Sequence, residues 1–122
     1  MSGANYRRGA DLERAAKHYL EDNGYYVIKS GGSKGIIDLA AFKWCEILFV
    51  QCKRPKDGYL LPAERVAFRK RAAMHGAVPL AGYWAKEGRA ARHVAFRELT
   101  STGPAGNRDW TPDHAMRKET TP

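Results

Sequence analysis

The sequence predicts a small α/β domain of the mixed α+β kind, with a central mixed β-sheet of about five strands flanked by helices. Three observations lead to this class. Apolar residues recur at helical spacing in two segments, five short β-rich runs lie between glycine- and proline-containing turns, and one helical segment separates the third run from the fourth. A chain of 122 residues has room for one hydrophobic core, so we expect a single domain over residues 1–99.

The first helix is predicted over residues 9–23. Apolar side chains recur there at three- and four-residue spacing, and an Asn-Gly pair follows as a stop signal. Residues 1–8 come before this pattern and include Arg7 and Arg8, so we expect a flexible basic arm. Glu13 lies at the border of the apolar stripe, where a weak ion pair with Lys17 is the simplest interpretation on helix geometry alone.

Three β-rich runs follow at residues 25–29, 36–42 and 47–53. Short turns join them, so neighbouring strands should be antiparallel. The turn at residues 30–35 is glycine-rich, but it lacks the Gly-Lys-Ser/Thr ending of a nucleotide-binding loop, and no helical pattern follows it. We therefore expect a connection between strands there.

A second helix is predicted over residues 62–75, with Pro62 in its first turn and Gly76 as its stop. Two further strands are predicted at 78–84 and 94–99, and the helix between strands three and four is long enough for a parallel crossover. Residues 100–122 are polar and aperiodic and are expected to form a disordered tail. The apolar face of the second helix is predicted to hold Ala63, Val66, Ala67, Ala73 and Met74, with Lys70 in the same stripe and Arg65, Arg69 and Arg71 largely off it.

The net charge of +8 is unevenly distributed along the chain. Residues 54–97 hold ten Lys and Arg against three Asp and Glu, whereas residues 98–122 hold three against four. A basic domain favours a polyanionic partner, most often nucleic acid, although a solvated basic surface accounts for charge alone equally well. No apolar run approaches the roughly 20 residues of a membrane span, and two unpaired cysteines suit a reducing compartment, so we expect no membrane partner and a cytoplasmic location.

A candidate metal site lies at the end of the third strand. Asp38 stands in an apolar run, where an ionisable group is costly to bury unless it is paired or binds a metal. Side chains alternate along a strand, so Gln51 and Lys53 should share one face while Val50 and Cys52 point to the other. The oxygens of Asp38, the Gln51 amide, the Cys52 backbone carbonyl and, if the first helix packs suitably, Glu13 form a set that hard divalent cations prefer.

These residues resemble the PD-(D/E)XK nuclease superfamily, which has a restriction-endonuclease-like core. The match comprises Glu13 in the first helix, Asp38 after Ile37, and Gln51-Cys52-Lys53. Gln51 takes the place of the usual acidic residue, and Mrr-type nucleases carry a similar Gln-x-Lys version. Within the superfamily, residues 6–99 look most like archaeal-type Holliday junction resolvases and their phage-borne relatives.

The resemblance implies a magnesium- or manganese-dependent endonuclease that cleaves four-way DNA junctions by phosphodiester hydrolysis, as a homodimer with two symmetric cuts. It implies catalytic roles for Glu13, Ser33, Asp38, Gln51 and Lys53, with Ser33 in the glycine-rich turn. A bacterial or archaeal host cell, with the gene borne by a phage, is the implied setting. Candidate phosphate contacts are Arg7, Arg8, Lys29, Lys34, Arg54, Lys56, Arg65 and Arg69.

Two other functions remain open. A nuclease of the same fold, Mrr-like or directed at ends or nicks, would be indifferent to branching. A catalytically silent module that binds branched DNA would follow if Gln51 marks a lost metal site. Cleavage assays in magnesium and binding assays at varied salt separate the three.

Overall fold

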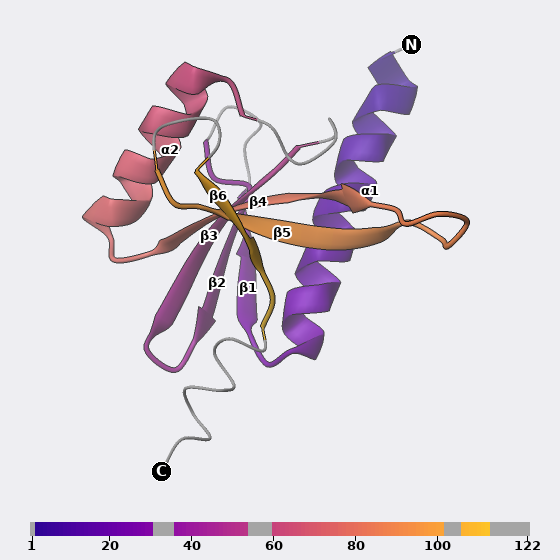
Figure 1. Ribbon diagram of the computed structural model, residues 1–122. Coiled ribbons are helices and arrows are strands. Elements are labelled where there is room, and N and C mark those ends of the chain that lie inside the picture. The colour runs from indigo at the N-terminus through magenta and orange to yellow at the C-terminus, as the bar shows by residue number, and fades with distance from the viewer. Residues whose placement is uncertain (1, 31–35, 54–59, 102–105, 113–122) are drawn as a thin grey trace.

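The computed structural model describes residues 2–30, 36–53, 60–101 and 106–112, with side chains described from residue 10 onward. The described part of the chain forms one six-stranded mixed sheet and two helices (Figure 1). The helices are α1 (Ser2–Asp22) and α2 (Pro62–Met74). The strands are β1 (Tyr26–Lys29), β2 (Leu39–Lys43), β3 (Glu46–Cys52), β4 (Val78–Ala85), β5 (His93–Leu99) and β6 (Asn107–Trp110).

The strands lie in the sheet in the same order as in the chain, from β1 to β6. Only β3 and β4 pair in parallel, and the other four neighbouring pairs are antiparallel. A parallel pair needs a long connection, and α2 supplies it. The predicted fold class and the crossover between the third and fourth strands are therefore confirmed.

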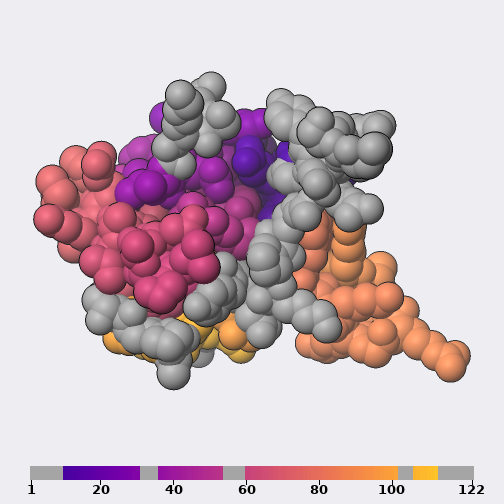
Figure 2. Space-filling model, turned by 90° about the horizontal axis from the view of Figure 1, so that it is seen from above, coloured from indigo at the N-terminus to yellow at the C-terminus, as the bar shows by residue number. Residues whose placement is uncertain are grey.

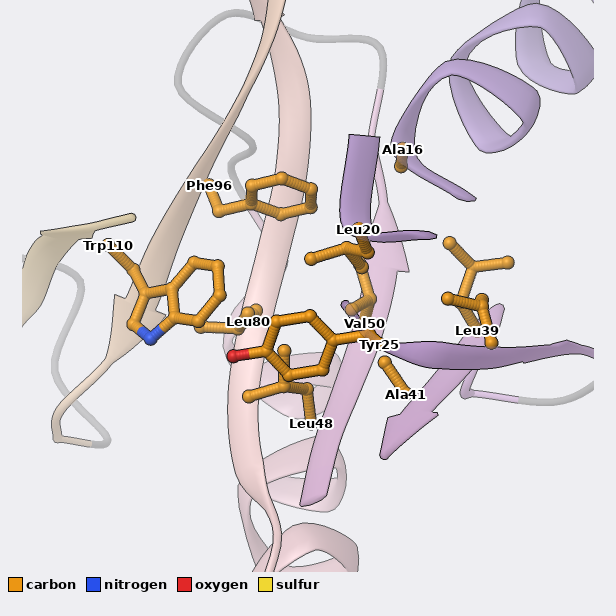
Figure 3. Packing of buried hydrophobic residues seen from close by; sticks show 11 residues of the cluster. Ala16, Leu20, Tyr25, Leu39, Ala41, Leu48, Val50, Leu80, Phe96 and Trp110 are labelled. Carbon is orange, nitrogen blue, oxygen red and sulfur yellow. The ribbon is translucent and has the colours of Figure 1, made fainter. Parts of the chain in front are cut away.

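The two helices cover opposite faces of the sheet (Figure 1). Ala16 and Leu20 of α1 pack against Leu80 and Phe96 in one buried cluster. Phe68 of α2 packs with Ala81, whose side chain points to the opposite side from that of its neighbour Leu80. Figure 3 shows the α1 cluster, which also contains Tyr25, Leu39, Ala41, Leu48, Val50 and Trp110.

Both ends of the chain differ from the sequence prediction. Helix α1 begins at Ser2, so the expected flexible arm at residues 1–8 is helical from residue 2 onward. Strand β6 lies in the expected disordered tail, where Trp110 is 5% exposed and its ring lies 5.8 Å from that of Phe96. Backbone pairing with β5 and one large buried side chain are enough to order this polar segment.

The buried face of α2 also differs from the prediction. Its buried residues are Arg65, Phe68 and Ala72. The guanidinium of Arg65 has acceptors in the chain beyond β5, so an arginine can face the interior together with the large ring of Phe68. The residues predicted to face the core are exposed, namely Ala63, Val66, Ala67, Ala73 and Met74, and Lys70 is exposed as well.

Candidate active site

Backbone and side-chain bonds of Asp38 join the start of β2 to the end of β3. The Asp38 N–H donates to the carbonyl of Val50 at 2.9 Å, and its own carbonyl accepts from Ser30 at 2.9 Å. The N–H of Cys52 donates to Asp38 Oδ2 at 2.7 Å. The Asp38 carboxylate is therefore fixed at the end of β3, where the sequence predicts a site.

Glu13 reaches the same region from α1. Its Oε1 lies 3.6 Å from Nζ of Lys29, so its partner is on β1, whereas Lys17 pairs with Glu21. Burial raises the pKa of the Glu13 carboxyl above its ordinary value, the negative charge of Asp38 adds to the rise, and Lys29 opposes it. Two carboxylates thus lie close enough to repel each other.

The surroundings of Asp38 also favour its protonated form. Burial is the largest effect and raises the pKa of this carboxyl. The N–H of Cys52 and the charges of Lys53 and Lys29 lower the pKa without cancelling that rise. Burial, followed by the charges of Asp38 and Glu13, raises the pKa of the Cys52 thiol well above its usual range, so the thiol is neutral at physiological pH. A bound cation would reverse the balance at both carboxylates.

Gln51 is buried and its side-chain oxygen lacks a partner. The residue is 8% exposed, and no hydrogen bond to Oε1 comes from the described residues. A buried amide oxygen without a donor costs about 1–3 kcal/mol, so such an atom calls for an explanation. A hard divalent cation takes amide oxygens as ligands, and the unpaired Oε1 fits that role.

The alternation predicted for the end of β3 agrees with the structure. Val50 and Cys52 belong to the cluster under α1. Gln51 pairs in register with Ala81, which belongs to the cluster under α2. Lys53 also points toward α2, because its Nζ donates to Glu64 Oε2 at 2.9 Å.

Glu64 is a site residue that sequence reasoning missed. It is the third residue of α2, and its Oε1 accepts from the N–H of Leu61 at 3.0 Å while its Oε2 holds Lys53. The hydrogen bond from Lys53 and the one from Leu61 lower the pKa of its carboxyl. A Glu three residues after a helix start is a capping signal that was available in the sequence.

Two predicted phosphate contacts are structural residues. Arg65 is 3% exposed and donates to Ser101 O, Asn107 Oδ1 and Gly106 O at 2.5–2.7 Å. Arg69 donates to the carbonyls of Leu99 and Thr100. Their guanidinium groups hold the connection after β5. Arg65 is too deeply buried to reach DNA, whereas Arg69 is half-buried and still has free N–H groups.

The structure describes only some of the other predicted site residues. Lys29 is exposed and beside Glu13, as phosphate contact or carboxylate pairing requires. Arg7 and Arg8 lie on α1, but their side chains are outside the described part of the structure. Ser33, Lys34, Arg54 and Lys56 also lie outside the described residues.

The sequence predicts a donor set of Glu13, Asp38, the Gln51 amide and the Cys52 carbonyl. Within the described residues, no three Asp, Glu, His or Cys side chains gather closely enough to hold a metal ion by themselves. With Gln51 in place of an acid, the set has two carboxylates, and the amide and a backbone carbonyl would have to complete it. The repulsion between the two carboxylates fits a divalent cation between them, and the unpaired Oε1 of Gln51 is a further oxygen suited to such a cation.

The mixed sheet with its two flanking helices, together with Glu13 on α1, Asp38 before β2 and Gln51-Cys52-Lys53 at the end of β3, defines a restriction-endonuclease-like fold of the PD-(D/E)XK class. Residues 4–103 match the model of the archaeal Holliday junction resolvase (Hjc) family. The chain belongs to that family, as its sequence resemblance predicts.

Two relatives place the chain further. It is 48% identical over 48 residues to the crossover junction endodeoxyribonuclease Hjc of Methanocaldococcus jannaschii, a match that takes in 39% of this chain and 35% of that protein. The aligned part is thus about a third of the curated relative's length. The structure of the Holliday junction resolvase Hjc from Archaeoglobus fulgidus superposes with a TM-score of 0.59 at 24% identity, covering 84% of this chain and 83% of that one, and shows the fold.

Proposed function

We propose that this chain is a divalent-metal-dependent endonuclease that cleaves four-way DNA junctions by phosphodiester hydrolysis. The observation that carries the proposal is the approach of the Glu13 carboxylate to Asp38, which is fixed at the end of β3 by the N–H of Cys52. The buried side-chain oxygen of Gln51, on the same strand end, supports it because no described residue donates to it. Family membership supports the same activity. Hydrolysis of a phosphodiester needs an activated water and charge neutralisation, and hard cations on oxygen ligands supply both.

The residues of this chain would divide the work as follows. Glu13, Asp38, the Gln51 amide and the Cys52 carbonyl would hold the cation, for which we propose Mg²⁺ or Mn²⁺. Lys53 is an ammonium with three donors, of which one goes to Glu64. The remaining donors can bind a phosphate oxygen or orient the attacking water, so Lys53 neutralises charge while Glu64 holds it in place. We keep Ser33 as a further candidate catalytic residue.

We also propose a homodimer, because two equivalent sites match a two-fold branched substrate. The face of β1 and β2 opposite α1 supports this state. Tyr26 and Phe42 are directly opposite each other there, and together with Ile28 they are 36–70% exposed. An apolar surface of this kind favours burial against a second copy. Light scattering of the protein, with Phe42→Glu as a monomer-forming variant, tests it.

The decisive experiment incubates the protein with a four-way junction and with a linear duplex in magnesium. We expect cleavage of the junction and little of the duplex. Lys53→Ala, checked for native folding by circular dichroism, should bind the junction but cut it at least a hundredfold more slowly. Equal cutting by the variant would rule out the assigned site, and equal cutting of duplex would favour an end- or nick-directed nuclease.

A silent junction-binding module is the second candidate, and Gln51 is the observation that favours it. An amide in place of a carboxylate removes one negative charge from the donor set and weakens cation binding. Tight, salt-dependent binding without cleavage in either magnesium or manganese would select this function.

Action on DNA also leads us to propose a cytoplasmic location in a bacterial or archaeal cell. A phage origin stays a prediction from the family resemblance. Of the helices that the structure describes, neither is long and apolar enough to span a bilayer.

A further inference from the structure

The hairpin formed by β4 and β5 extends beyond the end of β3 that carries the site. Cys52, the last residue of β3, pairs with Gly82, whereas β4 continues to Ala85 before the chain turns back. Three more strand residues add about 10 Å. In Figure 1 the hairpin runs past α1, and Figure 2 shows it as an orange projection from the body of the molecule.

The tip of this hairpin carries unpaired positive charge. Lys86, Arg89 and Arg92 are all exposed between the two strands, and the same stretch holds one acid, Glu87. No ion pair formed among the described residues includes these three cations. Arg65 and Arg69 differ from these three cations, because their guanidinium groups already donate hydrogen bonds to backbone carbonyls.

One of the three cations has a fixed position. The guanidinium of Arg92 lies 4.3 Å from the centroid of the Trp84 ring, and Trp84 is half-buried on β4. Stacking on an aromatic ring holds the guanidinium plane while its N–H edges stay free for phosphate oxygens. Gly88, with φ of 57°, allows the turn at the tip, in which the N–H of Ala90 donates to the carbonyl of Glu87.

We propose that the β4–β5 tip, consisting of Lys86, Arg89 and Arg92, is a phosphate-binding finger that grips a duplex arm of the DNA beside the cleavage site. This assignment rests on the proposed function. A narrow projection with unpaired cations fits the sugar–phosphate backbone of a helix, since phosphate contacts need charge and reach but no complementary pocket. The site at the end of β3 and the finger would then hold the same DNA at two points.

The test compares two double variants that each remove two charges. Arg89→Gln/Arg92→Gln alters the finger, and Lys70→Gln/Arg71→Gln alters two exposed cations on α2 as a matched control. Binding of a labelled four-way junction is measured by fluorescence anisotropy between 50 and 300 mM NaCl, with calcium in place of magnesium to prevent cleavage. Thermal melting checks that both variants are folded.

We expect the finger variant to bind several-fold more weakly at the lowest salt, with a plot of log K against log salt that is less steep by about 0.9 for each lost contact. The control should keep the slope of the unaltered protein. Arg89→Lys/Arg92→Lys, which retains both charges, should largely restore it.

An unchanged slope in the finger variant, or an equal change in the control, would overturn the proposal. The finger and the proposed function fail in distinguishable ways. Salt-dependent binding that needs the finger, with no cleavage in magnesium or manganese, would overturn the nuclease and support the finger. Cleavage of the junction, with binding that the finger substitutions do not change, would support the nuclease and overturn the finger.

Discussion

Replacing Arg65 with Met should destabilise the protein and leave its affinity for DNA intact. The guanidinium is buried and donates three hydrogen bonds, to Ser101 O, Gly106 O and Asn107 Oδ1. Hydrogen bonds from a charged group contribute roughly 1.5–3 kcal/mol each. Desolvation, which lowers the pKa of this guanidinium, offsets part of that gain.

The Met side chain would keep the apolar contacts of the arginine stem, and the freed carbonyls beside exposed Ser101 can bind water. We therefore expect the free energy of unfolding to fall by about 2–4 kcal/mol. Urea denaturation measures it. Arg71→Met, on the exposed side of the same helix, should change it by less than about 0.5 kcal/mol.

The alternative, in which Arg65 contacts phosphate, makes the reverse prediction. Stability would then stay within about 1 kcal/mol of the unaltered protein, and the salt slope of junction binding would drop by about 0.9. That pair of results would refute the structural role of Arg65. If the variant loses both stability and junction affinity, binding is measured again at low temperature, where the variant is folded. Affinity that returns there shows that the loss came from unfolding.

Three further predictions concern the site. Asp38 has a raised pKa when folded, so the folded state binds more protons and stability falls as pH rises from the ordinary value of 3.8 through the raised pKa. In buffer with a chelator, so that no cation is bound, Asp38→Asn should therefore raise the free energy of unfolding at pH 7 and leave it unchanged below pH 3.8. Chemical denaturation at several pH values measures this difference. Gln51→Leu removes an unpaired buried oxygen that costs about 1–3 kcal/mol, so the free energy of unfolding should not fall. The same variant should lose the manganese binding that calorimetry measures, and intact binding would contradict the ligand role. Glu64→Gln keeps an acceptor for the helix cap but loses the charge beside Lys53, so kcat should fall several-fold at constant KM, whereas Glu64→Ala should also cost about 1 kcal/mol of stability.

Much of the fold followed from local patterns. The periodicity of α1 and the β-rich runs identified the helices and five of the six strands, because those patterns are set by which side chains face the core. Strand β6 was missed because its sequence, NRDW, has three polar residues and one aromatic one and no alternation of polar and apolar side chains. Only the packing of Trp110 on Phe96 makes the segment part of the core. The same limit applied to α2, whose buried face depends on acceptors of Ser101, Gly106 and Asn107.

The part of the candidate site that could be predicted consists of residues on neighbouring strands joined by a short turn. Asp38 directly precedes β2, and Gln51 and Lys53 lie at the end of β3. The pairing of these strands follows from a short turn, so the approach of Asp38 to the end of β3 could be inferred. The approach of Glu13 depends on how α1 packs across the sheet, and residue spacing cannot give that. Glu64 is brought to Lys53 by the crossover itself, so its role becomes visible only once the packing of α2 is known.

The order of the strands has a consequence for how this chain acquires its structure during synthesis. Each strand from β2 to β6 pairs with the strand that left the ribosome just before it, so the sheet can grow at one edge without waiting for distant partners. Packing across the sheet does wait, since α1 packs on Phe96 and Tyr25 lies against Trp110. Arg65 waits too, because its acceptors at Ser101, Gly106 and Asn107 emerge about forty residues later. The nascent protein would hold an unsatisfied guanidinium against its sheet until β6 arrives, which makes the last strand the step that completes the domain.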